Sequence, residues 1–440
     1  MKAFKSNRPA SVGEPVTLAM SRRASGGAPV HDIGLDDEPI GARIAHVRKL
    51  RGLTQNELAQ RVPCSKSLIA QVERGHKPAT PALVAAVARA VNVDVTELTG
   101  QPYRGRTART DRIHATVSEL RQALVYGDVP PDLETPARSL DDLETEVMRV
   151  NKFRQTAQYV ELGTTLPGLI QELTYTVHAL SEPERARAFG LLSHAYSAAD
   201  SMVYKLGYLD LFHVAVHRMT WAAEQADDPM LRPVSDVRRS MAFMATGAWD
   251  GGLRLLDRTS QQLEDGQRTS DPTTLSVYGT VQLRAAILAA RANRSSAAWA
   301  YMQEADETAK RLRRDTNDYG LFFGPSNVAI HDVAVAVELG DADEAIRRSS
   351  SFTLSASVPA ERASHHYIDL SRAWLWAGKR DRALSCVLTA ETIAPQRTRY
   401  HPMARETVGR LLDVQRRIPE NLRGVATRMG LGRSGSITRS

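Results

Sequence analysis

Residues 54–75, TQNELAQRVPCSKSLIAQVERG, decide the fold of the first part of this chain, because they predict two short helices joined by a tight turn. Thr54 and Glu57 have the T-x-x-E spacing of a capping box, which begins the first helix. Pro63 ends that helix, since proline cannot continue a helix interior. Ser65 is a favourable N-cap, so the second helix is expected to begin directly after it.

Each of these two helices has an apolar face at helical spacing and a polar face opposite. The residues expected to be buried are Leu58, Ala59, Val62, Ile69 and Val72. Gly75 is a favourable residue for the end of the second helix. The polar face of that helix presents Lys66, Ser67 and Gln71. Polar side chains placed in this way can reach base edges in the major groove of DNA.

Three further helices complete a five-helix domain predicted over residues 39–100. One is expected from Ile40 to about Leu50, with Ile44, Val47 and Leu50 facing inward. Another opens at Thr80-Pro81, where an N-cap is followed by proline at the first helical position. A short fifth helix ends the domain. Two helices as short as the central pair cannot bury a core alone, so the other three are needed to cover it.

Residues 39–99 resemble the Cro/repressor-type helix-turn-helix of the xenobiotic-response-element (XRE) family. The matching letters are Arg48, Gly52-Leu53-Thr54-Gln55, Glu57-Leu58-Ala59, Ser65, Ile69, Glu73-Arg74-Gly75 and Leu83. The resemblance implies a five-helix, lambda-repressor-like domain whose partner is double-stranded DNA. It departs at the turn, where the family usually has glycine and this chain has Pro63.

The resemblance also implies roles for individual residues. Lys66, Ser67 and Gln71 would read bases, and Gln55 would hold a phosphate or a base edge. The full set of expected DNA-binding residues is Gln55, Ser65, Lys66, Ser67, Gln71, Arg74 and Lys77. Arg48 and Glu73 would form a partly buried ion pair that ties the first helix to the third.

The positive charge of the chain is unevenly distributed. The formal net charge is +7, but residues 1–109 carry +8 and the remaining residues carry −1. A basic excess confined to one end is the electrostatic footprint of polyanion binding. The larger C-terminal part is therefore not expected to bind nucleic acid itself.

The composition narrows the class of protein. Two cysteines, Cys64 and Cys386, give no disulfide framework and are typical of a reducing, cytoplasmic setting. No run of eighteen apolar residues predicts a membrane span, and the first residues lack a signal-peptide core. No pattern indicates a metal site, a cofactor or a catalytic arrangement, so the chain is not expected to be an enzyme. A GxGxxG pattern at residues 430–435 lies in a terminal tail, without the strand that a dinucleotide site requires.

Composition also predicts where the domains end. Residues 1–38 are rich in Ser, Gly, Pro and Ala and are expected to be a disordered arm. Residues 101–110 are a basic, breaker-rich linker, residues 111–423 a helical repeat domain, and residues 424–440 a flexible basic tail.

Helix pairs recur through the long C-terminal part. From Ser364 to Pro395 the chain resembles a tetratricopeptide (TPR) repeat. The matching residues are Tyr367, Leu370, Ser371, Trp374, Gly378, Ala383, Ala390 and Pro395. Earlier inter-helix turns are predicted at Gly207, Gly247, Asn293 and Gly340. The turns recur every 38 to 47 residues, so TPR-like is the safer description. Stacked helix pairs of this kind form an α-solenoid, and a capping helix is expected over His401–Arg417.

A helix-turn-helix followed by a TPR-like array resembles the layout of the peptide-responsive quorum-sensing regulators (the RRNPP group). It also resembles a large bacterial set of transcriptional regulators that share motifs such as NDYGLFFGPSNVAIHDVAVAVELGD, residues 317–341. In the peptide-responsive group, inward asparagines hold an effector peptide. The matching candidates are Asn151, Gln155, Gln282, Asn327 and His331. The alternative is that these side chains make hydrogen bonds between helices of the solenoid.

The sequence thus predicts an all-α, cytoplasmic, sequence-specific transcriptional regulator. It would be a homodimer on a palindromic operator, with a repeat domain that binds a peptide or small-molecule effector. The alternative is a protein–protein adaptor whose TPR-like groove holds a protein partner.

Overall fold

A computed structural model describes residues 38–103, 108–264, 271–415 and 417–431. The predictions for residues 1–37, for 104–107 of the linker and for 432–440 of the tail lie outside these residues. Within the described ranges the regular elements are helices, and the one β-bridge joins Thr316 to Phe323. The predicted all-α class is confirmed. None of the described helices is long and apolar enough to cross a membrane.

The N-terminal domain has the five predicted helices. They are α1 (Ile40–Leu50), α2 (Gln55–Arg61), α3 (Lys66–Glu73), α4 (Pro81–Val91) and α5 (Val95–Thr99). Local chemistry fixes their starts, as predicted. The Thr54 hydroxyl accepts from the Glu57 amide and the Glu57 carboxylate accepts from the Thr54 amide, which is the capping box. The hydroxyls of Ser65 and Thr80 cap α3 and α4 in the same manner.

One predicted core position of this domain is wrong. Leu50 was expected to face inward, but its side chain is 69% exposed. The inward stripe of α1 instead runs through Ile40, Ile44 and Arg48, four residues apart. Leu50 lies six positions after Ile44, which at 3.6 residues per turn places Leu50 on another face.

The rest of the chain is an array of antiparallel helices. Its elements are α6 (Ala108–Ala115), α7 (Val117–Tyr126), α8 (Leu140–Gln155), α9 (Tyr159–Ala179), α10 (Glu184–Leu206), α11 (Leu209–Gln225), α12 (Leu231–Thr246), α13 (Trp249–Gln262), α15 (Pro272–Arg291), α16 (Ser295–Leu312), η1 (Asp318–Gly320), α17 (Pro325–Glu338), α18 (Ala342–Ser349), α19 (Ala360–Trp376), α20 (Arg380–Ile393), α21 (Pro395–Tyr400), α22 (Pro402–Val414) and α23 (Glu420–Met429). Consecutive helices such as α10 and α11, α15 and α16, and α19 and α20 pack most extensively.

The predicted inter-helix turns are in place. Gly207, Gly247, Asn293, Gly340 and Gly378 each follow a helix and each has a positive φ. A left-handed residue reverses the chain after a helix, and glycine and asparagine adopt that conformation at the lowest steric cost. The repeats are therefore helix pairs stacked as a TPR-like solenoid.

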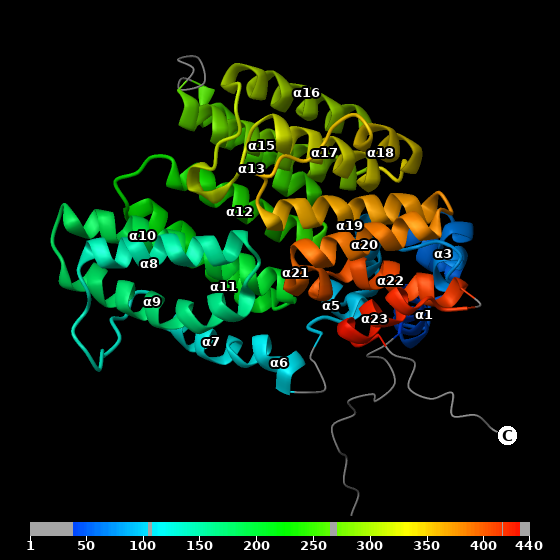
Figure 1. The fold of residues 1–440 in the computed structure, drawn as a ribbon, viewed down its shortest axis with the longest axis horizontal. Coiled ribbons are helices and arrows are strands. Elements are labelled where there is room, and N and C mark those ends of the chain that lie inside the picture. The colour runs from blue at the N-terminus through cyan, green and yellow to red at the C-terminus, as the bar shows by residue number, and fades with distance from the viewer. Residues whose placement is uncertain (1–37, 104–107, 265–270, 416, 432–440) are drawn as a thin grey trace, which may run out of the picture.

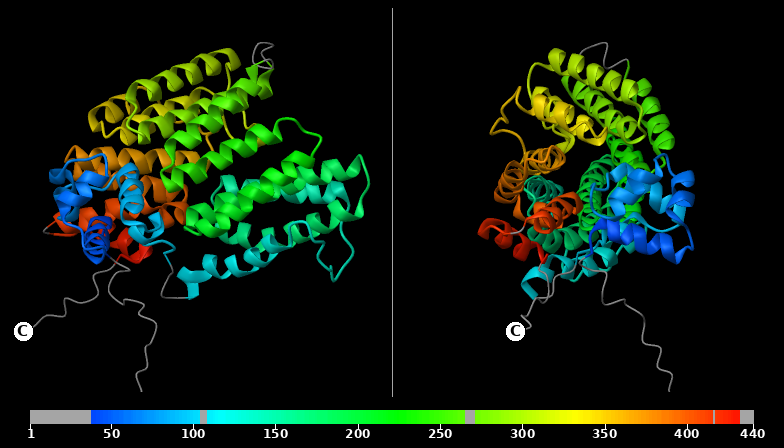
Figure 2. Two further views of the ribbon diagram at one scale, coloured as in Figure 1. Left: turned by 180° about the vertical axis from the view of Figure 1, so that it is seen from behind. Right: turned by 90° about the vertical axis from the view of Figure 1, so that its right-hand side faces the viewer.

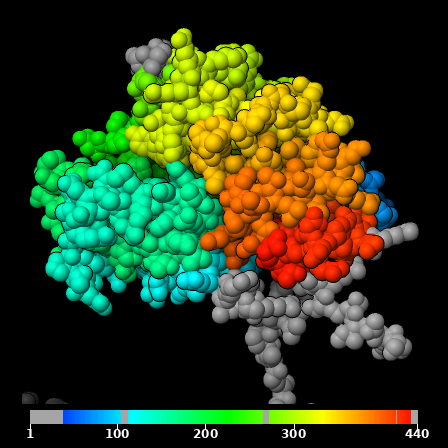
Figure 3. All heavy atoms as spheres, viewed as in Figure 1, coloured from blue at the N-terminus to red at the C-terminus, as the bar shows by residue number. Residues whose placement is uncertain are grey.

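The array curls round until its last helices meet its first part. Viewed from the side, the helices follow one another round a closed ring, with the N-terminal domain set against one side (Figure 2). α19 packs against both α17 and α8, and α21 contacts α10. In the space-filling view only an edge of the N-terminal domain appears, beside the helices near the C-terminus (Figure 3).

The hydrophobic interior is divided between two main clusters. The larger one runs from α6 through α17. The second unites the core of the N-terminal domain, such as Leu58 and Val87, with Val408, Leu411 and Val425 of the last helices. Segments more than 300 residues apart in sequence thus share one core, and Figure 1 shows the N-terminal domain at the same end of the molecule as α20, α22 and α23.

Two predicted boundaries need correction. The linker was placed at residues 101–110, but α6 begins at Ala108 and Tyr103 is packed under Arg405. The flexible tail was expected from Gly424 onward, yet α23 continues to Met429. Val425 and Met429 lie in the second cluster, so burial of their side chains outweighs the basic composition of the segment.

Candidate nucleic-acid interface

A buried ion pair fixes α3 against α1. Arg48 donates through Nε to Oε1 of Glu73 at 2.6 Å and through Nη2 to Oε2 at 2.8 Å. Its Nη1 reaches the Leu53 carbonyl at 2.6 Å. This is the pair that the family resemblance implies, and the two-point geometry sets both the distance and the angle between the helices.

Gln55 joins the same cluster, because its side-chain amide donates to Oε2 of Glu73 at 2.8 Å. Burial alone would raise the pKa of Glu73, but the hydrogen bonds from Arg48 and Gln55 outweigh burial and leave that pKa lowered. Glu73 is therefore ionised and bound on both sides. Gln55 was expected to contact DNA. In the structure its side-chain amide nitrogen binds Glu73 of α3, and the side chain is half-buried.

The turn between α2 and α3 is built without glycine. None of residues 62–65 has a positive φ, and the Cys64 amide donates to the Val62 carbonyl at 2.7 Å. Pro63 is exposed in this turn. The chain therefore reaches α3 by a local path other than the glycine turn usual in the family, and the two helices still pack through Leu58 and Ile69.

The outer face of α3 is polar and open. Lys66 and Ser67 are exposed, and Gln71 is half-buried. The Gln71 amide donates to the Ser67 hydroxyl at 3.2 Å, so these two side chains one turn apart are ordered against each other. Ile69 and Val72 on the opposite face are 1% exposed. The helix is thus anchored along one side and offers hydrogen-bonding groups along the other.

The loop after α3 carries basic side chains and is held from behind. Arg74 and Lys77 are exposed. Nη1 of Arg410, in α22, donates to the Gly75 carbonyl at 2.6 Å. Gly75 has a φ of +80°, a conformation that favours glycine, and a Cβ there would lie 2.2 Å from Nη1 of Arg410, so the Arg410 side chain would have to shift.

Glu406, one turn before Arg410, extends this contact to α1. It accepts from Nε of Arg410 at 3.0 Å and from the backbone amide of Ile40 at 3.3 Å. We call Glu406 and Arg410 the α22 clamp, because together they hold the start of α1 and the loop after α3. Sequence reasoning placed only a capping helix here. The one available signal was a pair of opposite charges at i,i+4 on the apolar side of an amphipathic helix.

The five effector candidates do not come together in one site. Asn151 donates to Val147 of its own helix, and Gln155 exchanges amide hydrogen bonds with Asn317. These contacts correspond to the structural alternative rather than to a ligand clamp.

The other three candidates are buried in the solenoid. Gln282 of α15 donates to Ser260 of α13 at 2.9 Å, and Asn327 donates to the Phe322 carbonyl at 2.6 Å. Of the five, His331 alone lies among the residues that line the central cavity described below.

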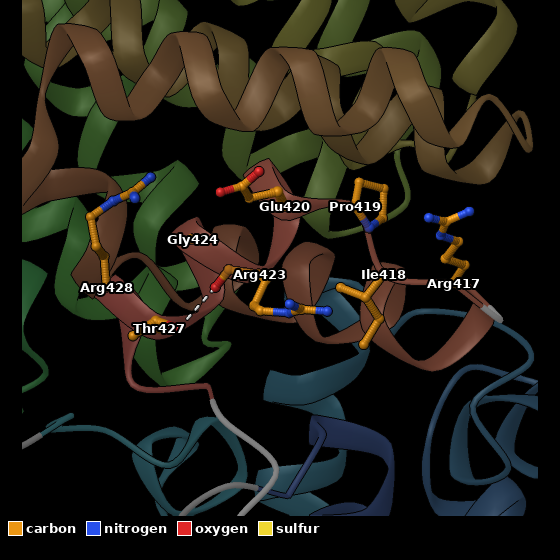
Figure 4. A pocket seen from close by; sticks show the side chains of 8 residues that line it. All are labelled: Arg417, Ile418, Pro419, Glu420, Arg423, Gly424, Thr427 and Arg428. Carbon is orange, nitrogen blue, oxygen red and sulfur yellow. Dashed lines mark hydrogen bonds between the residues drawn. The ribbon is translucent and has the colours of Figure 1, made fainter.

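A hollow of about 1110 Å³ lies along α23 (Figure 4). Its arginines, Arg417, Arg423 and Arg428, point away from one another, and Arg428 is bound to Glu391. An open hollow without converging polar groups lacks the features of a ligand site.

Comparisons with known proteins agree with this geometry at the N-terminus. Residues 39–99 match the family model described as a helix-turn-helix domain. The propionyl-CoA carboxylase regulator of Cereibacter sphaeroides is 36% identical over 94 residues, which are 21% of this chain and 18% of that protein. The chain thus spans about a fifth of the length of the curated relative that it matches.

Two solved structures are distantly similar over longer stretches. BtubC (BKLC) from P. vanneervenii is 16% identical with a TM-score of 0.33, covering 57% of this chain and 90% of that one. Bacillus thuringiensis PlcR, crystallised with the peptide PapR7 and DNA, is 14% identical with a TM-score of 0.29, covering 80% and 99%.

Proposed function

We propose that this chain, whose residues 39–99 are an XRE-type helix-turn-helix domain, is a sequence-specific DNA-binding transcriptional regulator. The observation that carries the proposal is the two-sided character of α3. Its inner face is fixed by Ile69, Val72 and the Arg48–Glu73 pair, and its outer face presents polar side chains to solvent. A helix held so rigidly can place its side chains reproducibly against base edges.

The polar side chains divide into two roles. Lys66, Ser67 and Gln71 lie on α3 itself and would read bases in the major groove. Arg74 and Lys77 follow the helix and would meet phosphates, which set the register without specifying sequence. Gln55 and Ser65 would act mainly by ordering α3, since both make hydrogen bonds to it.

We further propose that the regulator acts as a homodimer on a palindromic operator and responds to an effector held by the repeats. One small domain makes few base contacts, so two domains on adjacent half-sites are the usual route to useful affinity. The effector would act by favouring one of two arrangements of the DNA-binding domains, which requires that it bind the two arrangements with different affinity.

The test is capture of genomic DNA fragments by the purified full chain. The wild type is expected to enrich a short palindrome. A Lys66→Ala/Gln71→Ala variant is expected to lose that preference, because each lost base contact costs about 1–3 kcal/mol. The matched control is Gln303→Ala/Lys310→Ala, which removes the same two residue types from the exposed side of α16 and should leave the palindrome unchanged.

Salt supplies a second readout. Binding to the captured site should weaken steeply between 50 and 200 mM salt, through release of counterions from the phosphates. Enrichment that survives the α3 substitutions, or a wild type that enriches no site, would contradict the proposal. It would favour the adaptor alternative, in which the repeats hold a protein partner.

A further inference from the structure

A cavity lies at the centre of the ring, between the repeats and the DNA-binding domain. Its volume is about 250 Å³. Helices α10, α12, α15, α17 and α19 supply most of the wall, and α4 and α5 of the DNA-binding domain contribute residues such as Val84 and Thr96. A cavity of this volume can hold a small molecule.

The lining of this cavity is strongly basic. Among its described residues are Lys205 and seven arginines, against the three carboxylates Glu338, Glu361 and Asp369. Such an excess of one charge is unusual in an interior, because a buried charge is costly unless it is paired. The pairing of each cation therefore matters.

Six of the eight cations have carboxylate partners. Glu361 receives a hydrogen bond from Lys205 and lies within 4 Å of two arginines, while Glu338 binds Arg291. The remaining pairs are Arg238 with Asp200 and Arg372 with Asp369. The carboxylates are thus already shared among cations, and none is left for a further one.

Among the described residues, Arg284 and Arg362 are the two cations of the cavity lining without a carboxylate partner. Arg284 forms no ion pair or hydrogen bond with any described residue, and its Nε is buried without a partner. Arg362 donates to the Leu321 carbonyl at 3.1 Å and has no carboxylate within ion-pair distance in the described chain. Arg284 and Arg362 line the same cavity. Burial, and after it the charge of Arg362, lowers the pKa of Arg284 to about 9.

His331 lines the same cavity as the two arginines and offers an acceptor. Its Nδ1 is 2.9 Å from the Asn327 carbonyl, and a carbonyl can only accept, so Nδ1 carries the hydrogen and Nε2 carries a lone pair. Burial and the Arg362 charge lower the pKa of His331 to about 3, so the ring is neutral. A ligand here would find two cationic donors and one neutral acceptor.

We propose that this cavity is a binding site for a small anion, bearing a carboxylate or a phosphate, held by Arg284 and Arg362. Guanidinium groups bind both kinds of anion with paired hydrogen bonds, and the anion supplies the negative charge that the protein does not. His331 Nε2 would accept from a hydroxyl or N–H group of the same ligand.

The position of the cavity also connects the anion to DNA binding. Because α4 and α5 form part of its wall, occupancy changes the contacts between the DNA-binding domain and the repeats. This step rests on the proposed function; anion binding itself does not.

The binding experiment is thermal unfolding and titration calorimetry of the full chain with defined probes. Succinate and inorganic phosphate represent the two anion classes, glycerol 3-phosphate adds hydroxyl groups, and succinamide and glycerol are uncharged counterparts. Sodium chloride is adjusted to equal ionic strength throughout. We expect at least one anion to raise the Tm by a few °C at saturation, while its uncharged counterpart does not.

The variants assign the effect to the cavity. Arg284→Met and Arg362→Met should each lower the affinity for the anion at least tenfold. The control Arg254→Met removes the same charge from an exposed position on α13 and should bind as the wild type does. Arg284→Met is expected to fold, since an uncompensated buried charge is removed and an apolar side chain of similar length takes its place.

The inference is overturned if no probe raises the Tm above the chloride control, or if Arg284→Met and Arg362→Met both retain wild-type affinity. A shift with succinate alone assigns carboxylates, and a shift with the phosphates alone assigns phosphates. DNA capture without anion is scored separately, so failure of the ligand site and failure of the regulator proposal are distinguishable.

Discussion

At the scale of single residues, the most consequential interaction is the Arg48–Glu73 pair. The two side chains are 9% and 5% exposed, so neither has water to replace its partner. Gln55 and the Leu53 carbonyl satisfy further groups of the pair. A buried pair of this kind need not stabilise more than an apolar contact would, but losing one member leaves a buried charge alone.

Arg48→Met is therefore expected to destabilise the domain by about 3–5 kcal/mol, because Glu73 is left buried without its cation. Urea unfolding of the full chain measures the loss. The double variant Arg48→Met/Glu73→Leu should recover most of it. If the double variant were as unstable as the single one, the geometry of the pair rather than the lone charge would be the cause.

Glu73 also makes the stability of the domain depend on pH in the acid range. Its pKa is lowered in the folded chain, so its stabilisation is fully present above the unfolded value of about 4.3 and is lost as the pH falls through the folded value. We expect the Tm to fall below about pH 5, and Glu73→Gln to flatten that part of the profile. Equal acid sensitivity in both proteins would assign the effect to other carboxylates.

At the scale of elements, α22 does more than cap the solenoid. Its buried Val408 and Leu411 belong to the core of the DNA-binding domain, and the α22 clamp holds the start of α1 and the loop after α3. The loop that bears Arg74 and Lys77 is therefore positioned by a helix more than 300 residues further along the chain.

Arg410→Met is expected to lower affinity for the operator roughly tenfold, about 1.4 kcal/mol, by loosening the loop that meets phosphates. The preferred sequence should not change, because Lys66 and Gln71 remain on α3. Fluorescence anisotropy with the captured site and its single-base variants measures both quantities. Arg423→Met, on the exposed side of α23, controls for loss of charge; an altered base preference in Arg410→Met would contradict this role.

At the scale of the whole molecule, the DNA-binding domain packs directly against the repeat domain. It shares its core with α20, α22 and α23, and with the repeats it encloses the basic cavity. A substitution that destabilises the last helices should therefore also destabilise the DNA-binding domain.

Leu411→Ala tests this coupling. The residue is fully buried, and its truncation should cost about 2–5 kcal/mol. We expect faster amide hydrogen exchange in α1 and α4, although the substitution lies in α22. Leu173→Ala, equally buried in the larger cluster, is the matched control and should leave α1 and α4 protected. Similar exchange in the two variants would show that the two cores unfold as one unit instead.

Sequence by itself determined the local structure of this protein, since capping, helix periodicity and turns depend on residues a few positions apart. Thr54 with Glu57, Ser65, and the glycines at the repeat turns specify their elements without help from the rest of the chain. The polar face of α3 follows from the same periodicity. Family resemblance added the Arg48–Glu73 pair, whose partners are 25 residues apart.

Tertiary structure alone decided what depends on closure of the ring. Packing placed Leu50 outside, made α23 a core helix, and brought Arg410 against Gly75. It also dispersed the five effector candidates among separate hydrogen bonds and gathered cations from many helices into one cavity. The physical reason is that these contacts join residues far apart in sequence, and no local pattern records which helix faces will meet.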